Sequence, residues 1–222
     1  MSSSLDKAGE SYWSSFWKSS GTLPPPAYQD GKITGSYVVK ELDQFFTDTF
    51  KTLNHTEGLE LLEAGCGNSI WLSYFNKKFG FNVSGIDYSE FGCNQTRSIL
   101  KRDEVKGNIY HVDIFNPPVD LKEKYDVVCS FGVVEHFNDT VSVLKALSFF
   151  LKPGGIIITT VPNLMGPTGW LQKIFNKPVY DIHVIMDKEY LRNNLEKAGY
   201  QVNRCSYFCS LSFGVTFDEI NN

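Results

Sequence analysis

Residues 63 to 69, EAGCGNS, place two glycines one residue apart and an acidic side chain two positions before the first of them. Glycine at 65 and at 67 removes Cβ atoms, so the backbone can pass close to a bound ligand. Glu63 suits a positively charged ligand better than an anionic phosphate. The loop therefore has the composition of a binding site for a cationic small molecule.

Two phosphate-binding loops compete for these residues, and the spacing argues against both. A nucleotide P-loop has four residues between its glycines and then Lys followed by Ser or Thr, which this stretch lacks. The dinucleotide loop G-x-G-x-x-G of a nicotinamide oxidoreductase needs a third glycine where Ile70 stands. The loop [D/E]-x-G-x-G that binds S-adenosylmethionine, a cationic sulfonium, matches Glu63, Gly65 and Gly67.

Two more acidic residues follow at the ends of predicted strands. Asp87 ends the second strand 20 residues after Gly67, the separation at which a carboxylate meets a ribose diol. Asp113 closes the third strand, where a carboxylate can accept a hydrogen bond from an adenine amine. Strand-end acids can also cap helices or face solvent, but three at successive strand ends favour a nucleoside-binding edge.

The elements that position these residues alternate between strand and helix from residue 58 onward. Helices are expected at 69–79 and after Ser89, Asp139 and Asp187, each of which can cap a helix. Such alternation predicts an α/β domain, a parallel sheet with helices on both faces. Apolar runs predict five strands, followed by a closing antiparallel hairpin, at 59–64, 82–87, 109–114, 125–131, 156–161, 200–208 and 211–217.

Residues 1–30 differ in composition from the rest, and we predict an N-terminal helical arm at 1–57 before a domain at 58–222. The stretch SYWSSFW sets four aromatic residues on one face of a helix, at 12, 13, 16 and 17. A triple proline at 24–26 breaks the chain, and a second helix is expected between Ser36 and Leu53. The aromatic helix either packs on the edge of the sheet or closes over a ligand as a lid.

The successive segments LLEAGCGNS, GIDYSE, HVDIFN, YDVVCSFGVVEHF and FLKPGGIIITTVPN resemble, in this order, the motifs of the Rossmann-like (class I) S-adenosylmethionine-dependent methyltransferases. The resemblance covers roughly residues 59–162 and implies a seven-stranded sheet whose last strand is antiparallel. Ser69 departs from it, because a glycine usually stands there. The implied contacts with S-adenosylmethionine are Glu63, Gly65, Cys66, Gly67, Asn68, Asp87, Tyr88, Asp113, Ile114, Phe131 and Gly132.

The arm YWSSFWKSSGTLPPP is similar to the arm that closes over the cofactor in thiopurine- and halide-type small-molecule methyltransferases. This similarity implies that Trp13 and Trp17 cover the cofactor, with Tyr37 as a further wall. Aromatic faces would attract the sulfonium, and closure would exclude water from it.

Two histidines are candidate catalytic residues. His136 follows the fourth strand in VEHF, and His183 lies in YDIHV within an insertion at 163–186. Either imidazole can act as a general base for a hydroxyl. The alternative for His136 is that it packs under the cofactor or orients Glu135. Both segments loosely resemble the quinone-biosynthesis O-methyltransferases, which share EH after the fourth strand and a long insertion carrying a histidine.

The insertion also contains a predicted helix with an apolar face formed by Trp170, Leu171, Ile174 and Phe175, with lysines nearby. We expect this face to pack on the domain. The alternatives are a lid over a hydrophobic substrate and a weak membrane-surface contact through residues 164–177.

The net charge of −4 and pI of about 5.6, without a basic stripe, argue against nucleic acid as a partner. We expect a cytoplasmic protein with reduced thiols, since five cysteines form no C-x-x-C pair and neither a secretory signal nor a membrane span is visible. No zinc-ligand spacing occurs, so no metal is expected. The predicted function is methyl transfer to a small molecule, more at oxygen than nitrogen. The alternatives are transfer to a protein lysine or terminal amine, and a non-catalytic cofactor-binding partner subunit.

Overall fold

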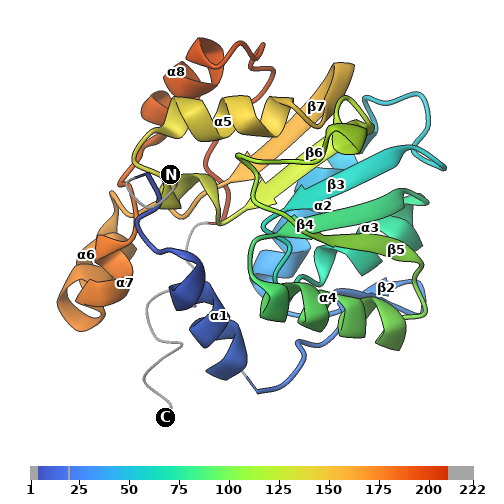
Figure 1. Cartoon of the computed structure of the whole chain (residues 1–222), viewed down its shortest axis with the longest axis horizontal. Coiled ribbons are helices and arrows are strands. Elements are labelled where there is room, and N and C mark those ends of the chain that lie inside the picture. The colour runs from blue at the N-terminus through green and yellow to red at the C-terminus, as the bar shows by residue number, and fades with distance from the viewer. Residues whose placement is uncertain (1–4, 20, 210–222) are drawn as a thin grey trace.

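The computed structural model describes residues 5–19 and 21–209, and its centre is a five-stranded sheet in which every pair of neighbours is parallel (Figure 1). The order across the sheet is β5-β4-β3-β6-β7, so the order reverses at β3, between β4 and β6. The strands are β3 (Glu60–Ala64), β4 (Asn82–Asp87), β5 (Gly107–His111), β6 (Tyr125–Phe131) and β7 (Leu151–Thr160). A separate antiparallel pair joins β1 (Tyr28–Gln29) to β2 (Lys32–Ile33).

Helices cover both faces of the sheet, as predicted (Figure 1). Successive strand residues point to opposite faces, and in β3 Leu61 packs with one hydrophobic cluster while Leu62 packs with the other. The first cluster includes side chains of three helices, α2 (Tyr37–Phe50), α3 (Trp71–Phe79) and α4 (Glu90–Arg102). The second includes side chains of α5 (Thr140–Ser148) and α8 (Lys188–Lys197). Three of these helices begin at the predicted caps, where the side chains of Ser89, Asp139 and Asp187 accept hydrogen bonds from backbone N–H groups three residues ahead.

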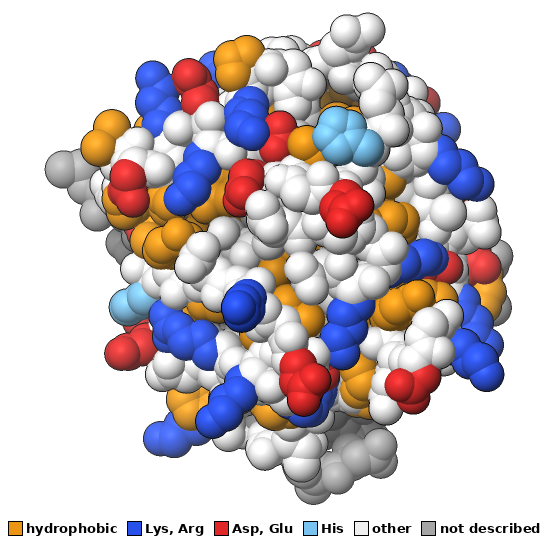
Figure 2. All heavy atoms as spheres, turned by 90° about the vertical axis from the view of Figure 1, so that its right-hand side faces the viewer, with side chains coloured by type: hydrophobic (Ala, Val, Ile, Leu, Met, Phe, Trp, Pro, Cys, Tyr) orange, Lys and Arg blue, Asp and Glu red, His pale blue; other side chains and the backbone are white. Residues whose placement is uncertain are grey.

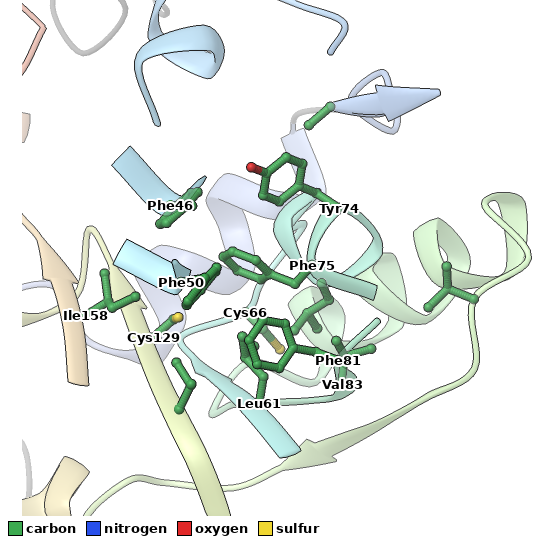
Figure 3. Close-up of a cluster of buried hydrophobic side chains, with 14 of the residues drawn as sticks. Phe46, Phe50, Leu61, Cys66, Tyr74, Phe75, Phe81, Val83, Cys129 and Ile158 are labelled. Carbon is green, nitrogen blue, oxygen red and sulfur yellow. The ribbon is translucent and has the colours of Figure 1, made fainter. Parts of the chain in front are cut away.

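The first cluster is rich in aromatic rings, and Figure 3 shows Phe46 and Phe50 of α2 beside Phe75 of α3. The ring centroids of Phe46 and Phe75 lie 4.9 Å apart, and those of Phe50 and Phe81 lie 5.0 Å apart. Truncating a buried Phe to Ala costs about 3–5 kcal/mol. This packing therefore fixes α3, whose first turn follows directly on the glycine loop.

The closing hairpin was predicted at 200–208 and 211–217. Residues 200–209 have no regular secondary structure, so the strand predicted at 200–208 is wrong in this structure, and 211–217 lie outside the described residues. A strand exists only where its backbone groups pair with a neighbour, and no strand of the described sheet pairs with 200–208. The described sheet therefore has five strands.

The predicted aromatic helix is present as α1 (Glu10–Ser19), and residues 5–9 lead into it through a turn and bends. That segment is tied to the turn after β6, because Lys7 N donates to the carbonyl of His136 and Asn138 N donates to the carbonyl of Leu5. α1 then lies along α4, where the hydroxyls of Ser14 and Ser89 are 2.9 Å apart. The N-terminal segment thus crosses the carboxyl ends of the strands.

The insertion forms α6 (Pro167–Phe175) and α7 (Lys177–Asp181), which project from one side of the molecule (Figure 1). The prediction that its apolar face packs on the domain is wrong for Trp170, Ile174 and Phe175, which are 63%, 54% and 61% exposed. The buried residues of α6 are instead Gly169 and Gln172. A Cβ atom at Gly169 would lie 1.9 Å from the carbonyl oxygen of Leu164, so the helix packs through its glycine.

Charged side chains of both signs are interspersed on the face shown in Figure 2. Within residues 5–19 and 21–209, no helix combines the length and apolar character needed to cross a membrane.

None of the five cysteines, all of which lie among the described residues, forms a disulfide.

Candidate functional site

A cavity of about 450 Å³, called here the first cavity, opens at the carboxyl ends of β3, β4 and β6. In open α/β sheets, this edge is where ligands bind, at the point where the strand order reverses. The structure brings most of the predicted site residues together there: its lining includes Trp13, Trp17, Glu63, Gly65, Gly67, Asn68, Asp87, Tyr88, Ile114, Phe131, Gly132 and His136.

Both glycines of the loop are required by its geometry. Gly65 has a φ of 73°, and a Cβ atom there would lie 2.3 Å from Cγ2 of Val133. At Gly67, a Cβ atom would lie 2.6 Å from the indole nitrogen of Trp17 and 3.0 Å from Oδ2 of Asp87. The loop can therefore approach the arm and the carboxylate only because it carries no side chain at these two positions.

Two carboxyl groups lie beneath the first cavity. Asp87 accepts hydrogen bonds from the backbone N–H groups of Gly67, at 2.8 Å, and Ser89, at 2.7 Å. Glu63 accepts from the hydroxyl of Ser69, whose Oγ lies 2.8 and 2.7 Å from its two oxygens. Burial raises the pKa of Asp87 to about 6 and that of Glu63 to about 8. Among the described residues neither acid forms an ion pair with Lys or Arg, so a cationic ligand would favour their charged forms.

Three predicted cofactor contacts do not line the first cavity. The strand expected to end at Asp113 ends at His111, and the Asp113 carboxylate accepts from Phe115 N and Asn116 Nδ2, as in an Asx turn. The thiol of Cys66 packs in the core against Gly85. Tyr37 is 50% exposed at the start of α2. Sequence position alone did not reveal these side-chain directions.

Several residues of the first cavity were missed by the sequence reasoning. Val133 packs against Gly65, and Phe137, Trp71 and Val112 add apolar walls. Ser69, noted only as a departure from the family pattern, is the hydrogen-bond donor to Glu63. The sequence could have indicated this hydrogen bond, because a hydroxyl stands six residues after the acid in a glycine loop. It gave no indication of the apolar wall residues, because they resemble ordinary core residues.

A second cavity of about 530 Å³ adjoins the first and shares Trp13, Gly132 and His136 with it. Its other walls come from α2, the insertion, α8 and the C-terminal described segment, and include Val38, Leu42, Leu164, His183, Met186, Leu191, Tyr207 and Phe208. Two of its charged residues make contacts of their own, since Asp187 caps α8 and the Lys188 amine lies over the ring of Tyr207. A third, Glu135, lies beside the two histidines. The wall is therefore largely apolar around the two histidines.

His136 and His183 are both buried and face each other, with ring centroids 4.6 Å apart. Burial lowers the pKa of His136 to about 4 and also lowers the pKa of His183, so both imidazoles are neutral near pH 7. Trp13 packs edge-on against His136, with a centroid distance of 4.9 Å. The carboxyl of Glu135 lies beside them, and burial raises its pKa to about 8.

The comparison with protein families agrees with this geometry. The family model described as a methyltransferase domain matches residues 35–204. The chain therefore belongs to the methyltransferase-domain family, and its fold and loop place it in class I, the Rossmann-like enzymes that use S-adenosylmethionine.

Individual relatives are more distant. A ubiquinone biosynthesis O-methyltransferase of Rhodopseudomonas palustris is 26% identical over 148 residues, which cover 67% of this chain and 57% of the relative. The chain thus matches just over half the length of that relative. A phosphoethanolamine N-methyltransferase of Haemonchus contortus, solved with S-adenosylhomocysteine, is similar with a TM-score of 0.56 at 17% identity, over 71% of this chain and 36% of that one.

The [4+2]-cyclase SpnF is similar with a TM-score of 0.62 at 17% identity, over 88% of this chain and 72% of that one. At such identities these structures establish the fold alone.

Proposed function

We propose that the protein transfers a methyl group from S-adenosylmethionine, held in the first cavity, to an acceptor held in the second. The observation that carries this proposal is the pair of buried acids, Glu63 and Asp87, beneath a glycine loop at the strand tips. A sulfonium nucleoside with a free amine matches these acids, whereas a pyrophosphate would be repelled. Trp13 and Trp17 of α1 form the cover, so within the arm predicted at 1–57 it is α1 that acts as the lid of the domain predicted at 58–222. α2 packs in the first hydrophobic cluster instead.

The acceptor is a small molecule methylated on oxygen. The second cavity has a largely apolar wall, and at its junction with the first it presents neutral imidazoles, which accept a hydrogen bond from a hydroxyl. The relatives named as ubiquinone biosynthesis O-methyltransferases support oxygen as the acceptor atom.

His136 and His183 assist removal of the acceptor proton. Methyl transfer is an in-line displacement, so alignment of oxygen, methyl carbon and sulfur supplies much of the rate. Because His136 borders both cavities, it stands where an acceptor oxygen meets the cofactor methyl. Removing the hydroxyl proton at that point makes the oxygen nucleophilic.

The test is a turnover screen with S-adenosylmethionine labelled in its methyl group, run against separated small-molecule and protein fractions of a cell extract. We expect label in an organic-soluble product together with S-adenosylhomocysteine. Label in protein would favour the lysine or terminal-amine alternative. Cofactor binding without any transfer would favour a non-catalytic partner subunit. Thermal stabilisation by NAD but not by S-adenosylmethionine would favour an oxidoreductase.

A weak membrane-surface contact through residues 164–177 is a second candidate property. It is supported by the exposed side chains of Met165, Trp170, Ile174 and Phe175, with Lys173 and Lys177 on the same segment. Apolar side chains flanked by lysines suit the boundary of an anionic bilayer. Flotation with vesicles containing anionic lipid tests this contact, and Trp170→Ser should reduce the bound fraction without changing turnover on a water-soluble acceptor.

A further inference from the structure

Glu135, His136 and His183 bring three metal-ligating side chains to one point at the junction of the two cavities. One ligand atom from each lies within 4.8 Å of the other two. All three residues are buried, with exposed fractions of 1%, 4% and 6%. Two of them come from the 3-10 turn η2 (Val134–His136) after β6, and the third comes from the insertion after α7.

The hydrogen bonds of the two imidazoles determine which nitrogen is free to bind a ligand. Nδ1 of His136 lies 3.0 Å from the carbonyl oxygen of Ile182, and Nδ1 of His183 lies 2.6 Å from that of Val179. A carbonyl only accepts, so each Nδ1 carries the proton and each Nε2 carries the lone pair. An imidazole whose Nδ1–H is held by a backbone carbonyl is the usual state of a metal-binding histidine.

The Glu135 carboxyl provides an independent observation. Its Oε2 is buried and has no hydrogen-bond partner in the structure. Buried polar atoms without partners are rare, because leaving one unpaired is costly. A cation bound among the three side chains would give this oxygen a partner.

The backbone holds these ligands in place. Val184 N donates to the carbonyl of Glu135 at 2.6 Å, which ties the insertion to the turn after β6. The Lys7 side chain donates to the carbonyl of His183 at 2.8 Å. The positive charge of this amine would repel a bound cation, but the amine donates its hydrogen bond to a backbone oxygen. The two segments that carry the ligands are therefore joined directly.

We propose that Glu135, His136 and His183 bind one divalent transition-metal ion, with zinc as the best match to two imidazoles and one carboxylate. Zinc–ligand distances of about 2.1 Å place ligand atoms no more than about 4.2 Å apart, so small side-chain rotations complete the site. Two imidazoles and a carboxylate on one side of an ion leave positions for an exogenous oxygen. If the proposed function holds, the acceptor oxygen takes such a position, and the cation lowers its pKa. The histidines then assist deprotonation as ligands.

The direct test is calorimetric titration of Zn²⁺ into tag-free protein stripped with a chelator, with Co²⁺ absorption as a second readout. We expect one ion per chain. His183→Ala and Glu135→Gln should each weaken zinc binding at least about tenfold. Replacing a residue that only hydrogen-bonds to a metal ligand already costs about 10–100-fold in metal affinity. His55→Ala is the matched control, because it removes an exposed imidazole, and its affinity should equal that of the wild type.

The proposal is overturned if the wild type binds no ion, or if all four proteins bind it equally. Melting temperatures of the metal-free proteins show whether a variant is folded. If His183→Ala does not fold, His183→Gln takes its place. S-adenosylmethionine is titrated into the same metal-free protein, which separates the two proposals. If the protein binds S-adenosylmethionine but not zinc, only the proposed metal site is contradicted. If it binds zinc but neither binds the cofactor nor turns over, only the proposed function is contradicted.

Discussion

The two cavities meet at His136 but differ in charge and in construction. The first lies above two buried acids and is formed mainly by loops that follow β3, β4 and β6. The second surrounds two neutral imidazoles and the Glu135 carboxyl with apolar side chains from α1, α2, the insertion and α8. Asp87, whose pKa is about 6, is charged near pH 7 and matches a cationic cofactor. The neutral imidazoles and the Glu135 carboxyl, whose pKa is about 8, match an uncharged acceptor. The difference in charge therefore separates where the cofactor binds from where the acceptor binds.

The largest effect is expected from Gly65→Ala. Its Cβ would collide with Val133 at a positive φ, so the loop must move, and we expect the affinity for S-adenosylmethionine to fall at least about 100-fold. Gly154→Ala is the matched control, since Gly154 also has a positive φ, 78°, but a Cβ atom there would meet nothing within 4 Å. It should lose about 1–2 kcal/mol of stability through φ alone and keep its affinity. Equal affinities in the two variants would contradict the role of the loop.

His136→Ala tests whether the boundary residue acts on the acceptor. We expect turnover to fall about 10²–10⁴-fold, the usual contribution of proton transfer. Cofactor affinity, measured by calorimetry, should change by less than about threefold, because the cofactor is held chiefly through the acids and the loop. A variant that loses cofactor affinity as strongly as turnover would place His136 in the cofactor site alone.

Glu63→Gln tests the buried acids through pH. Burial raises the pKa of Glu63 from 4.5 to about 8 in the folded protein. Its contribution to stability is therefore complete below pH 4.5 and is lost as the pH rises through about 8. Without cofactor, Glu63→Gln should melt above the wild type at about pH 8.5, and the difference should shrink toward about pH 5. Glu57→Gln, at an exposed position, should follow the wild type at both pH values. A constant difference would show that Glu63 is not held protonated.

Phe175→Ser should have the smallest effect on stability. Phe175 is 61% exposed on α6, so the free energy of unfolding should change by no more than about 0.5 kcal/mol. Phe75→Ala, in the core beside α2, should cost about 3–5 kcal/mol by contrast. If α6 is a lid over the second cavity, Phe175→Ser raises the KM for the acceptor. An unchanged KM with reduced binding to anionic vesicles supports the surface contact.

The sequence predicted the first cavity far better than the second, for a physical reason. Local spacing determines which residues follow a strand, so Gly65, Gly67 and Asp87 could be placed at the sheet edge. The directions of side chains such as Cys66 depend on packing, which no motif records. The second cavity joins segments far apart in the chain. Nothing local indicates that His183 contacts His136, although both were singled out, or that Glu135 completes a cluster with them.

The five parallel strands and the helix caps were predictable because apolar runs and capping residues are local signals. The absence of a strand at 200–208 was not predictable, because a strand forms only where a neighbouring strand pairs with it. The face of α6 was also predicted wrongly. Its aromatic residues gave the stronger periodic signal, but Gly169 makes the close contact with Leu164.

The central claim is that S-adenosylmethionine binds in the first cavity over Asp87, and calorimetry with wild type and Asp87→Asn tests it most directly. The substitution keeps the size of the side chain, removes its charge and leaves one acceptor oxygen for the backbone N–H groups of Gly67 and Ser89, which bond to separate oxygens of Asp87. Thermal melting shows whether the variant is folded. We expect the wild type to bind S-adenosylmethionine and the folded variant to bind it at least about tenfold more weakly. Equal affinity in the two proteins, or no binding to the wild type, would contradict the account.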